Sequence, residues 1–234
     1  MPRLIVALIR HGDYQQRPDT PSAHQPFPLS PLGEQQARQA GVEIAEFAAD
    51  LGLTLCPSLD CSSLLRAWQT AHILADSLPG NTDYTLHSTM ALAERSVGIA
   101  ANLTTADIES LLAQDPRCDT PPENWKSNSH YCLPLPGAES LMTAGQRVAQ
   151  HLRQRTAEPV ATDTLKVFVG HGAALRHAAL GRLQRSTQVG DFRAKLTNDL
   201  LRHILVTSAL VRDVLSAVGV VQRGQRLVVV VIGG

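Results

Sequence analysis

Two histidines follow directly after two apolar segments, and each is itself followed by glycine. His11 comes after Leu4–Ile9, and His171 comes shortly after Leu165–Val169. Both segments are rich in β-branched residues, which is typical of strands buried on both faces. Ligands of open α/β sheets bind at the carboxyl ends of the strands, so we expect the two imidazoles to face each other across one pocket. One such histidine alone would more often be structural, but two at strand ends favour a functional site.

Arginines add permanent positive charge next to these histidines. Arg10 directly precedes His11, and Arg66 lies at the expected start of a helix. A guanidinium presents a planar fork that matches phosphate oxygens, and the glycine after each histidine, Gly172 included, allows the backbone to approach a ligand closely. These residues indicate the binding of a phosphoryl group. Taken alone, Arg66 would be interpreted as a surface arginine paired with a carboxylate.

Four helices separate and follow the strands that carry these residues. Ser30 and Pro31 provide an N-cap and a proline at the first helical position, and Gly52 provides a stop. Apolar residues at helical spacing and capping signals predict helices at about 31–51, 64–78, 105–115 and 139–155. In the second helix, one side carries the residues expected to face the core, Leu65, Trp68, Ala71, Ala75 and Leu78. Helices interleaved with short apolar strands predict a layered α/β fold.

Proline-rich stretches and the C-terminal part complete the expected organisation. Asp13–Leu29 holds four prolines and is predicted to be an exposed loop, and residues 116–137 hold five and are predicted to form a long irregular excursion. From about residue 183 the sequence diverges from the pattern of strands and helices before it. The apolar residues of 193–218 are spaced as in one or two amphipathic helices, and the run Leu227–Ile232 predicts an isolated terminal strand. An apolar stripe exposed there would offer a surface for a homodimer.

Composition limits the classes of protein that fit. The 234 residues are 44% hydrophobic and 18% charged, which indicates one globular domain spanning 1–234. The 21 basic and 21 acidic residues balance, which argues against a general nucleic-acid or anionic-membrane binder. The apolar runs are too short to span a bilayer or to form a signal peptide, so we expect a cytoplasmic protein. The four cysteines form no CxxC pair, and neither a zinc ribbon nor a disulfide scaffold is expected.

Five ordered motifs resemble those of the histidine phosphatase superfamily, which contains phosphoglycerate mutases, the fructose-2,6-bisphosphatase domain and many small phosphatases. Arg-His-Gly alone is a weak signal, whereas the ordered set is specific. The motifs are Leu8–Gly12, Leu29–Ala37, Ser62–Ala71, Leu92–Arg95 and Val169–Gly172. The resemblance implies a three-layer α/β/α sandwich with a mostly parallel central sheet and its site at the carboxyl ends of the strands.

The resemblance also implies roles for single residues. His11 would be the nucleophile that becomes phosphohistidine, while Arg10, Arg66 and a protonated His171, with Gly172 beside it, would bind the phosphate. A neutral imidazole attacks phosphorus without a metal-activated water, and the three cationic groups would stabilise the charge on the equatorial oxygens. Neither a metal ion nor a cofactor is therefore implied.

Glu94 lies where the superfamily keeps its proton donor. It would protonate the leaving oxygen and then take a proton from the attacking water. The alternative is an exposed glutamate paired with Arg95. A metal site built from His11, His171 and Glu94 is a further alternative, disfavoured because the two neighbouring arginines would repel a cation.

Two departures from the superfamily's pattern bear on the activity. Asp13–Arg17 stands where a small hydroxyl residue and an asparagine often contact phosphate, and the small and apolar residues at 96–103 leave few groups for a second phosphate. We therefore expect a metal-independent phosphomonoesterase acting on a phosphorylated small molecule or a phosphoprotein. A phosphoglycerate mutase-type phosphotransferase and a non-catalytic phosphate-binding scaffold are the alternatives.

Overall fold

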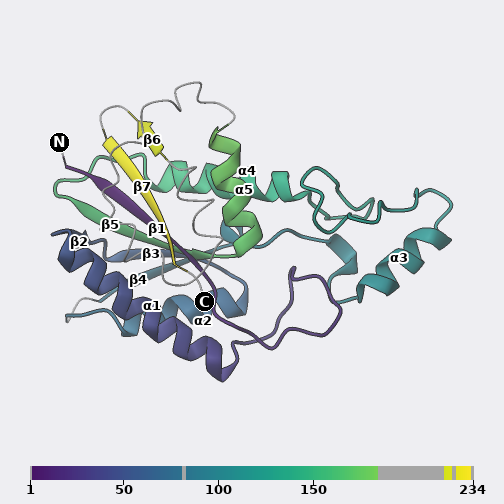
Figure 1. The fold of residues 1–234 in the computed structure, drawn as a ribbon, viewed down its shortest axis with the longest axis horizontal. Helices are drawn as coiled ribbons and strands as arrows, with labels where there is room; N and C mark the ends of the chain where they lie inside the picture. Colours follow the sequence, from purple (N-terminus) through teal and green to yellow (C-terminus); the bar gives the residue numbers. More distant parts are fainter. Residues whose placement is uncertain (1, 81–82, 184–218, 223–224, 233–234) are drawn as a thin grey trace.

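The structure is a computed structural model that describes residues 2–80, 83–183, 219–222 and 225–232. The strands described form one sheet in the order β4-β3-β5-β1-β7-β6, with β2 also paired to β5 (Figure 1). Every pairing is parallel except that of β6 with β7. The strands are β1 (Leu4–Arg10), β2 (Thr54–Leu55), β3 (Ser58–Ser62), β4 (Thr85–Thr89), β5 (Thr164–Gly170), β6 (Gly219–Gln222) and β7 (Gln225–Ile232).

Helices cover both faces of this sheet. α1 (Pro31–Asp50) and α2 (Leu65–Asp76) lie on one face, and α4 (Leu141–Arg155) and α5 (Gly172–Leu183) lie on the other (Figure 1). α3 (Thr105–Gln114) lies to one side, and two short 3₁₀ helices are η1 (Met90–Leu92) and η2 (Gly98–Ala100). The predicted three-layer α/β/α sandwich with a mostly parallel sheet is confirmed.

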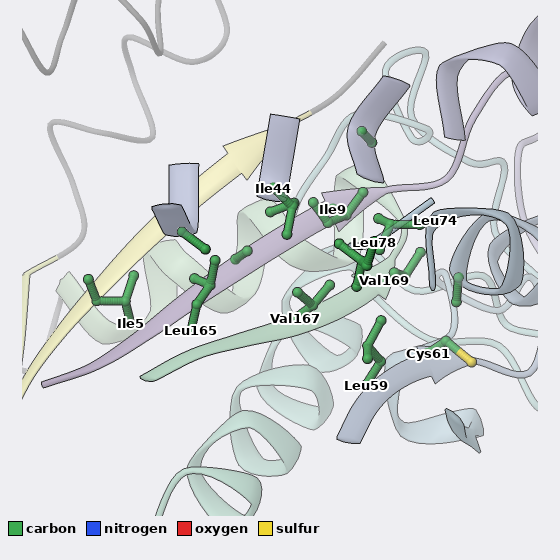
Figure 2. Close-up of a cluster of buried hydrophobic side chains, with 14 of the residues drawn as sticks. Ile5, Ile9, Ile44, Leu59, Cys61, Leu74, Leu78, Leu165, Val167 and Val169 are labelled. Carbon is green, nitrogen blue, oxygen red and sulfur yellow. The ribbon is translucent and has the colours of Figure 1, made fainter. Parts of the chain in front are cut away.

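The central strand β1 contributes to both hydrophobic layers. Ile5 and Ile9 point toward the core shared with α1 and α2, where they meet Ile44 (Figure 2). Val6 and Leu8 belong to the second core, with α4 and α5. Burial of an aliphatic side chain of this size contributes about 1.5–3 kcal/mol, which explains why β1 and β5 were predictable from their continuous apolar runs.

The start of α1 fixes the turn that follows β1. The Ser30 hydroxyl accepts a hydrogen bond from the Gly33 N–H, and Pro31 is the first helical residue. A Cβ atom at Gly12 would lie only 2.4 Å from the Gly33 carbonyl oxygen, so glycine is required where the turn meets the helix. α1 ends before Gly52, which has a φ of +61°, as its sequence predicts.

The orientation predicted for α2 is confirmed for Ala71 and Leu78, which are buried, and is wrong for Leu65 and Trp68. Leu65 and Trp68 are 38% and 39% exposed. The reason is that the helix turns Arg66 toward the sheet, and this rotation moves Leu65 and Trp68 to the outer side. The buried face consists of Arg66, Ala67, Thr70, Ala71 and Leu74.

The two proline-rich stretches are irregular, but neither is simply exposed. Within Asp13–Leu29, Ala23 and Gln25 are buried, because the segment folds back over the carboxyl ends of the strands. Trp125 of the 116–137 excursion is buried against Ile108 of α3 in a separate small core. Both stretches therefore carry tertiary contacts.

The predicted helices within 193–218 lie outside the described residues. The expectation that Leu227–Ile232 is an isolated strand is wrong, because it belongs to β7, which pairs in parallel with β1 from Val6↔Val229 to Ile9↔Ile232. The pairing covers the β1 edge that β5 leaves free. No helix in the described ranges combines the length and the apolarity needed to cross a membrane.

Candidate active site

The parallel pairing of β1 with β5 brings the two histidines together. Arg10 is in register with Gly170, and the His11 N–H donates to the Gly170 carbonyl at 3.0 Å. The imidazole ring centroids of His11 and His171 are 4.9 Å apart, with an interplanar angle of 57°. Both rings therefore lie at the carboxyl edge of the sheet, where ligands of α/β folds bind.

The contacts of His11 define its tautomer. Its Nδ1 lies 2.7 Å from the Gly12 carbonyl oxygen, which can only accept, so Nδ1 carries the proton and Nε2 the lone pair. Burial, the Arg66 guanidinium and, less strongly, Arg10 lower the pKa of His11 to about 3, against a smaller opposing effect of the Gly12 hydrogen bond. His11 is thus a neutral imidazole with an available nitrogen near pH 7.

Arg66 projects from the first turn of α2 into the centre of the site. Its Nε donates to His11 Nε2 at 3.2 Å, and its Nη1 and Nη2 donate to the carbonyls of Gln25 at 3.1 Å and Ala23 at 2.9 Å. The side chain is fully buried, and burial lowers its pKa. It is not the surface arginine that its position alone would suggest.

His171 differs from its expected state. Its Nε2 shares a 2.9 Å hydrogen bond with the Ser62 hydroxyl, and its buried Nδ1 has no hydrogen-bond partner among the residues that the structure describes. Burial first, then Arg66 and His11, lower the pKa of His171 well below its ordinary value. Without a bound anion these surroundings favour the neutral ring, whereas the sequence predicts a protonated His171 around a bound phosphate. Ser62, at the end of β3, is a site residue that sequence reasoning missed, although it opens one of the five motifs.

Arg10 and Gly172 line the outer side of the site. The Arg10 side chain is exposed, and its Cδ would lie 3.3 Å from a Cβ atom at Gly172. Gly172 is the first residue of α5. Glycine at this position leaves room for the arginine beside the strand ends.

Glu94 is buried, so the expected alternative of an exposed glutamate is wrong. Its carboxylate accepts hydrogen bonds from the Arg95 N–H at 2.9 Å and the Ala174 N–H at 3.1 Å, with the Ala173 N–H at 3.4 Å. Two of these donors belong to the N-terminal turn of α5, where a negative charge is stabilised by the helix dipole. Glu94 thus lies directly beside the turn that carries His171.

Two residues hold the segment that carries Glu94, and sequence reasoning did not identify them. Arg147 of α4 donates to the carbonyls of Met90, Ala91 and Ala93 at 3.0–3.2 Å. It is paired with Glu139 at 2.7 Å. Neither residue belongs to one of the five motifs, and only the folded arrangement shows that Arg147 contacts residues 90–93 and that Glu139 pairs with it.

Residues 23–25 lie against the site. His24 Nε2 lies 2.8 Å from the Glu94 carbonyl, and the Ala23 and Gln25 carbonyls occupy two donors of Arg66. As a result Arg66 and His171 are 0% exposed and His11 is 3% exposed. The carbonyls of this segment thus occupy Arg66 donors that a phosphoryl group would need.

Other reactive groups lie apart from this arrangement. In the described residues no three His, Cys, Asp or Glu side chains are grouped so that they could hold a metal ion. The four cysteines are free thiols, and burial raises the pKa of Cys61 to about 11.

Comparisons with known proteins agree with this fold. Residues 6–215 match the model of the histidine phosphatase superfamily (branch 1). The 2,3-bisphosphoglycerate-dependent phosphoglycerate mutases of Methylocella silvestris and Parvibaculum lavamentivorans are 29% and 27% identical over 75% of this chain, and 79% and 78% of their own length is covered.

Solved structures with the same fold are less similar in sequence. A mycobacterial glucosyl-3-phosphoglycerate phosphatase in complex with VO3 is 23% identical, with a TM-score of 0.56 over 76% of this chain and 81% of its own. A putative alpha-ribazole-5'-P phosphatase from Escherichia coli is 21% identical, with a TM-score of 0.53 over 75% and 77%. With the family match covering most of its length, the chain belongs to the histidine phosphatase superfamily.

Proposed function

We propose that the protein is a metal-independent phosphatase that hydrolyses a phosphomonoester through a phosphohistidine intermediate on His11. The observation that carries this proposal is the state of that ring. Nδ1 is bound to a carbonyl, Nε2 holds a lone pair, and Arg66 lies within hydrogen-bond distance of the same nitrogen. The substrate class is a phosphorylated small molecule or a phosphoprotein.

In the first step, His11 Nε2 attacks phosphorus, the N–P bond forms and the ester P–O bond breaks. Arg66 must release Nε2 for the attack, and its N–H donors would then turn to the oxygens of the phosphoryl group. The leaving oxygen takes a proton, which we assign to the carboxyl group of Glu94. In the second step water attacks phosphorus, the N–P bond breaks, and the Glu94 carboxylate accepts the proton of the water.

The charges of the site support this chemistry. Phosphoryl transfer places negative charge on the three equatorial oxygens, and fixed cationic donors stabilise it best where water is excluded. Arg66 is fixed and buried, and Arg10 borders the same strand ends. A bound dianion would favour protonation of His171, whose Nδ1 has no partner in the structure, and would thereby supply a further donor.

A mutase is the second candidate, because the curated relatives at 27% and 29% identity are phosphoglycerate mutases. A mutase must hold a bisphosphorylated intermediate and therefore needs cationic groups beyond the first phosphate. Residues 96–103 contain no basic side chain, and Val97 and Ala100 are buried in the core around Trp125. This segment therefore favours hydrolysis.

The test uses para-nitrophenyl phosphate at pH 5–8, with EDTA present to remove metal ions. Wild-type protein should turn over at an undiminished rate, and acid-labile phosphate should be trapped on His11. His11→Ala should abolish both signals, whereas His87→Ala, an exposed histidine on the edge strand β4, should leave them unchanged. Phosphate trapped on another residue, or activity lost with EDTA, would refute the proposal.

Two further measurements refine the assignment. Glu94→Gln should slow an alkyl phosphate by about 10²–10⁴-fold and para-nitrophenyl phosphate much less, because nitrophenolate leaves without a proton. Equal losses for the two esters would remove Glu94 from the proton relay. Conversion of 3-phosphoglycerate at a rate above hydrolysis would favour the mutase.

A further inference from the structure

We propose that Tyr14 is a positioning residue that fixes the Arg66 guanidinium and the His11 imidazole relative to each other for phosphoryl transfer. The inference rests on the proposed function and concerns a residue to which neither the motifs nor the proposed chemistry assigns a role. It lies within Asp13–Arg17, one of the two departures of this sequence from the superfamily's pattern.

The Tyr14 ring contacts both members of the pair. Its centroid lies 5.3 Å from that of His11 in an edge-on arrangement, with an interplanar angle of 86°. The Arg66 Cζ lies 4.5 Å from the same centroid, over the face of the ring. One aromatic side chain thus packs against the proposed nucleophile and stacks against the guanidinium.

The position of this ring is itself constrained. The backbone of Tyr14 forms an antiparallel bridge with Leu29, and the neighbouring Gln15 N–H donates to the Pro28 carbonyl at 3.0 Å. The hydroxyl shares a 2.9 Å hydrogen bond with Ser22 Oγ, and the residue is only 8% exposed. A ring held at both ends can orient its neighbours rather than follow them.

An aromatic face suits this arginine better than a carboxylate would. In the described part of the chain no carboxylate forms an ion pair with Arg66, whose hydrogen bonds go to His11 and to two backbone carbonyls. The negative face of an aromatic ring attracts a guanidinium without neutralising it. Arg66 therefore keeps the full charge that a phosphate requires, while its plane is fixed.

Kinetics of three variants test the role. Tyr14→Phe keeps the ring and should retain kcat/KM within about threefold, because only the hydrogen bond to Ser22 is lost. Tyr14→Leu removes the aromatic face and should lower kcat/KM by about 30-fold, mainly through kcat, since misorientation impairs the attack more than binding. Tyr84→Leu is the matched control, a tyrosine packed against the α1/α2 core, and should remain within about threefold.

An NMR titration of the His11 ring separates positioning from general loss of structure. The charged and titratable groups around this ring are Arg10 from β1, Arg66 from α2, His171 after β5 and Glu94 beside α5. In wild type and Tyr14→Phe, His11 should stay neutral down to pH 5. In Tyr14→Leu the displaced guanidinium no longer depresses the pKa of His11 as strongly, so that pKa should rise toward its ordinary value.

The results for the variants either support or contradict the role of Tyr14. Wild-type kinetics and an unchanged titration in Tyr14→Leu would overturn the inference, as would equal losses in Tyr14→Phe or in Tyr84→Leu. If the wild type forms no phosphohistidine at all, the proposed function fails. In that case the titration still shows whether Tyr14 fixes the Arg66–His11 pair, since it needs no turnover.

Discussion

A neutral imidazole and a buried guanidinium share one hydrogen bond at the centre of this site. The guanidinium is satisfied by the ring and by two carbonyls, none of which carries a charge. Transfer of an ion from water to such surroundings is costly, so the site is stabilised by any anion that enters it. This arrangement explains at the level of single atoms why a phosphoryl group is the favoured ligand.

His171 gives this preference a measurable pH dependence. Its pKa is depressed by burial and by Arg66, which favours the neutral ring in the free protein. A bound dianion should raise that pKa, and binding should then take up one proton. The affinity for sulfate, which does not titrate near neutral pH, should fall about tenfold per unit of rising pH between the two pKa values of His171. Calorimetry in buffers of different ionisation enthalpy would measure both the affinity and the proton uptake.

His171→Gln provides the control for this measurement, because its amide cannot titrate. The pH dependence should disappear in the variant. If the variant still takes up a proton, the site of protonation is His11, and His171 is not the group that couples binding to pH.

At the scale of elements, a strand could be predicted where its own side chains determine its structure, and was missed where contacts with distant residues do. β1 and β5 were predicted because the runs Leu4–Ile9 and Leu165–Val169 are apolar apart from Lys166, and the strand-end rule then predicted that His11 and His171 meet. β3 was missed because its sequence, SLDCS, is mostly polar. Two of its polar side chains contact distant residues, Asp60 with Lys166 and Ser62 with His171.

The cover formed by residues 23–25 was not predictable for a related reason. Its contacts with Arg66 are made by the backbone carbonyls of Ala23 and Gln25. Because every residue has a backbone carbonyl, the sequence does not indicate which carbonyls bind the arginine. Proline content correctly indicated an irregular segment and wrongly indicated an exposed one. Burial of this loop is decided by tertiary hydrogen bonds rather than by its composition.

This cover should open when an anion binds. Phosphate oxygens compete for the Arg66 donors that the Ala23 and Gln25 carbonyls now occupy. The segment should therefore lose its two hydrogen bonds with the charged guanidinium when the anion binds. Hydrogen exchange followed by mass spectrometry should show faster exchange in peptides spanning 19–29 at saturating orthovanadate, with unchanged exchange in α4. Slower exchange in 19–29 would mean that the cover closes on the ligand and keeps its contacts.

At the scale of the whole molecule, a second group of charges joins α4 to the sheet below it. Asp60 of β3 is 1% exposed and accepts from Arg155 Nε at 2.8 Å, and it pairs with Lys166 Nζ of β5 at 2.9 Å. His151 of α4 lies 3.2 Å from the same carboxylate. The cluster fixes α4 against the sheet, and α4 in turn carries Arg147, which holds the Glu94 segment.

Asp60→Asn should therefore destabilise the fold without entering the chemistry. The substitution leaves Lys166, which is only 5% exposed, without its counter-ion in the interior. Removing one partner of a buried pair costs about 3–5 kcal/mol, a large part of the roughly 5–15 kcal/mol that stabilises a domain. Urea unfolding followed by circular dichroism should show this loss, and kcat should stay near the wild-type value at temperatures where the variant is folded.

The exposed pair of Arg3 and Asp163 supplies the matched comparison. Its atoms are 2.6 Å apart, closer than those of the Asp60 pairs, but both side chains are in contact with solvent. Asp163→Asn should change the unfolding free energy far less than Asp60→Asn, because water replaces the lost partner. Equal effects of the two substitutions would show that α4 does not depend on the buried cluster, and that hydrophobic packing alone places Arg147 and the Glu94 segment beside the histidines.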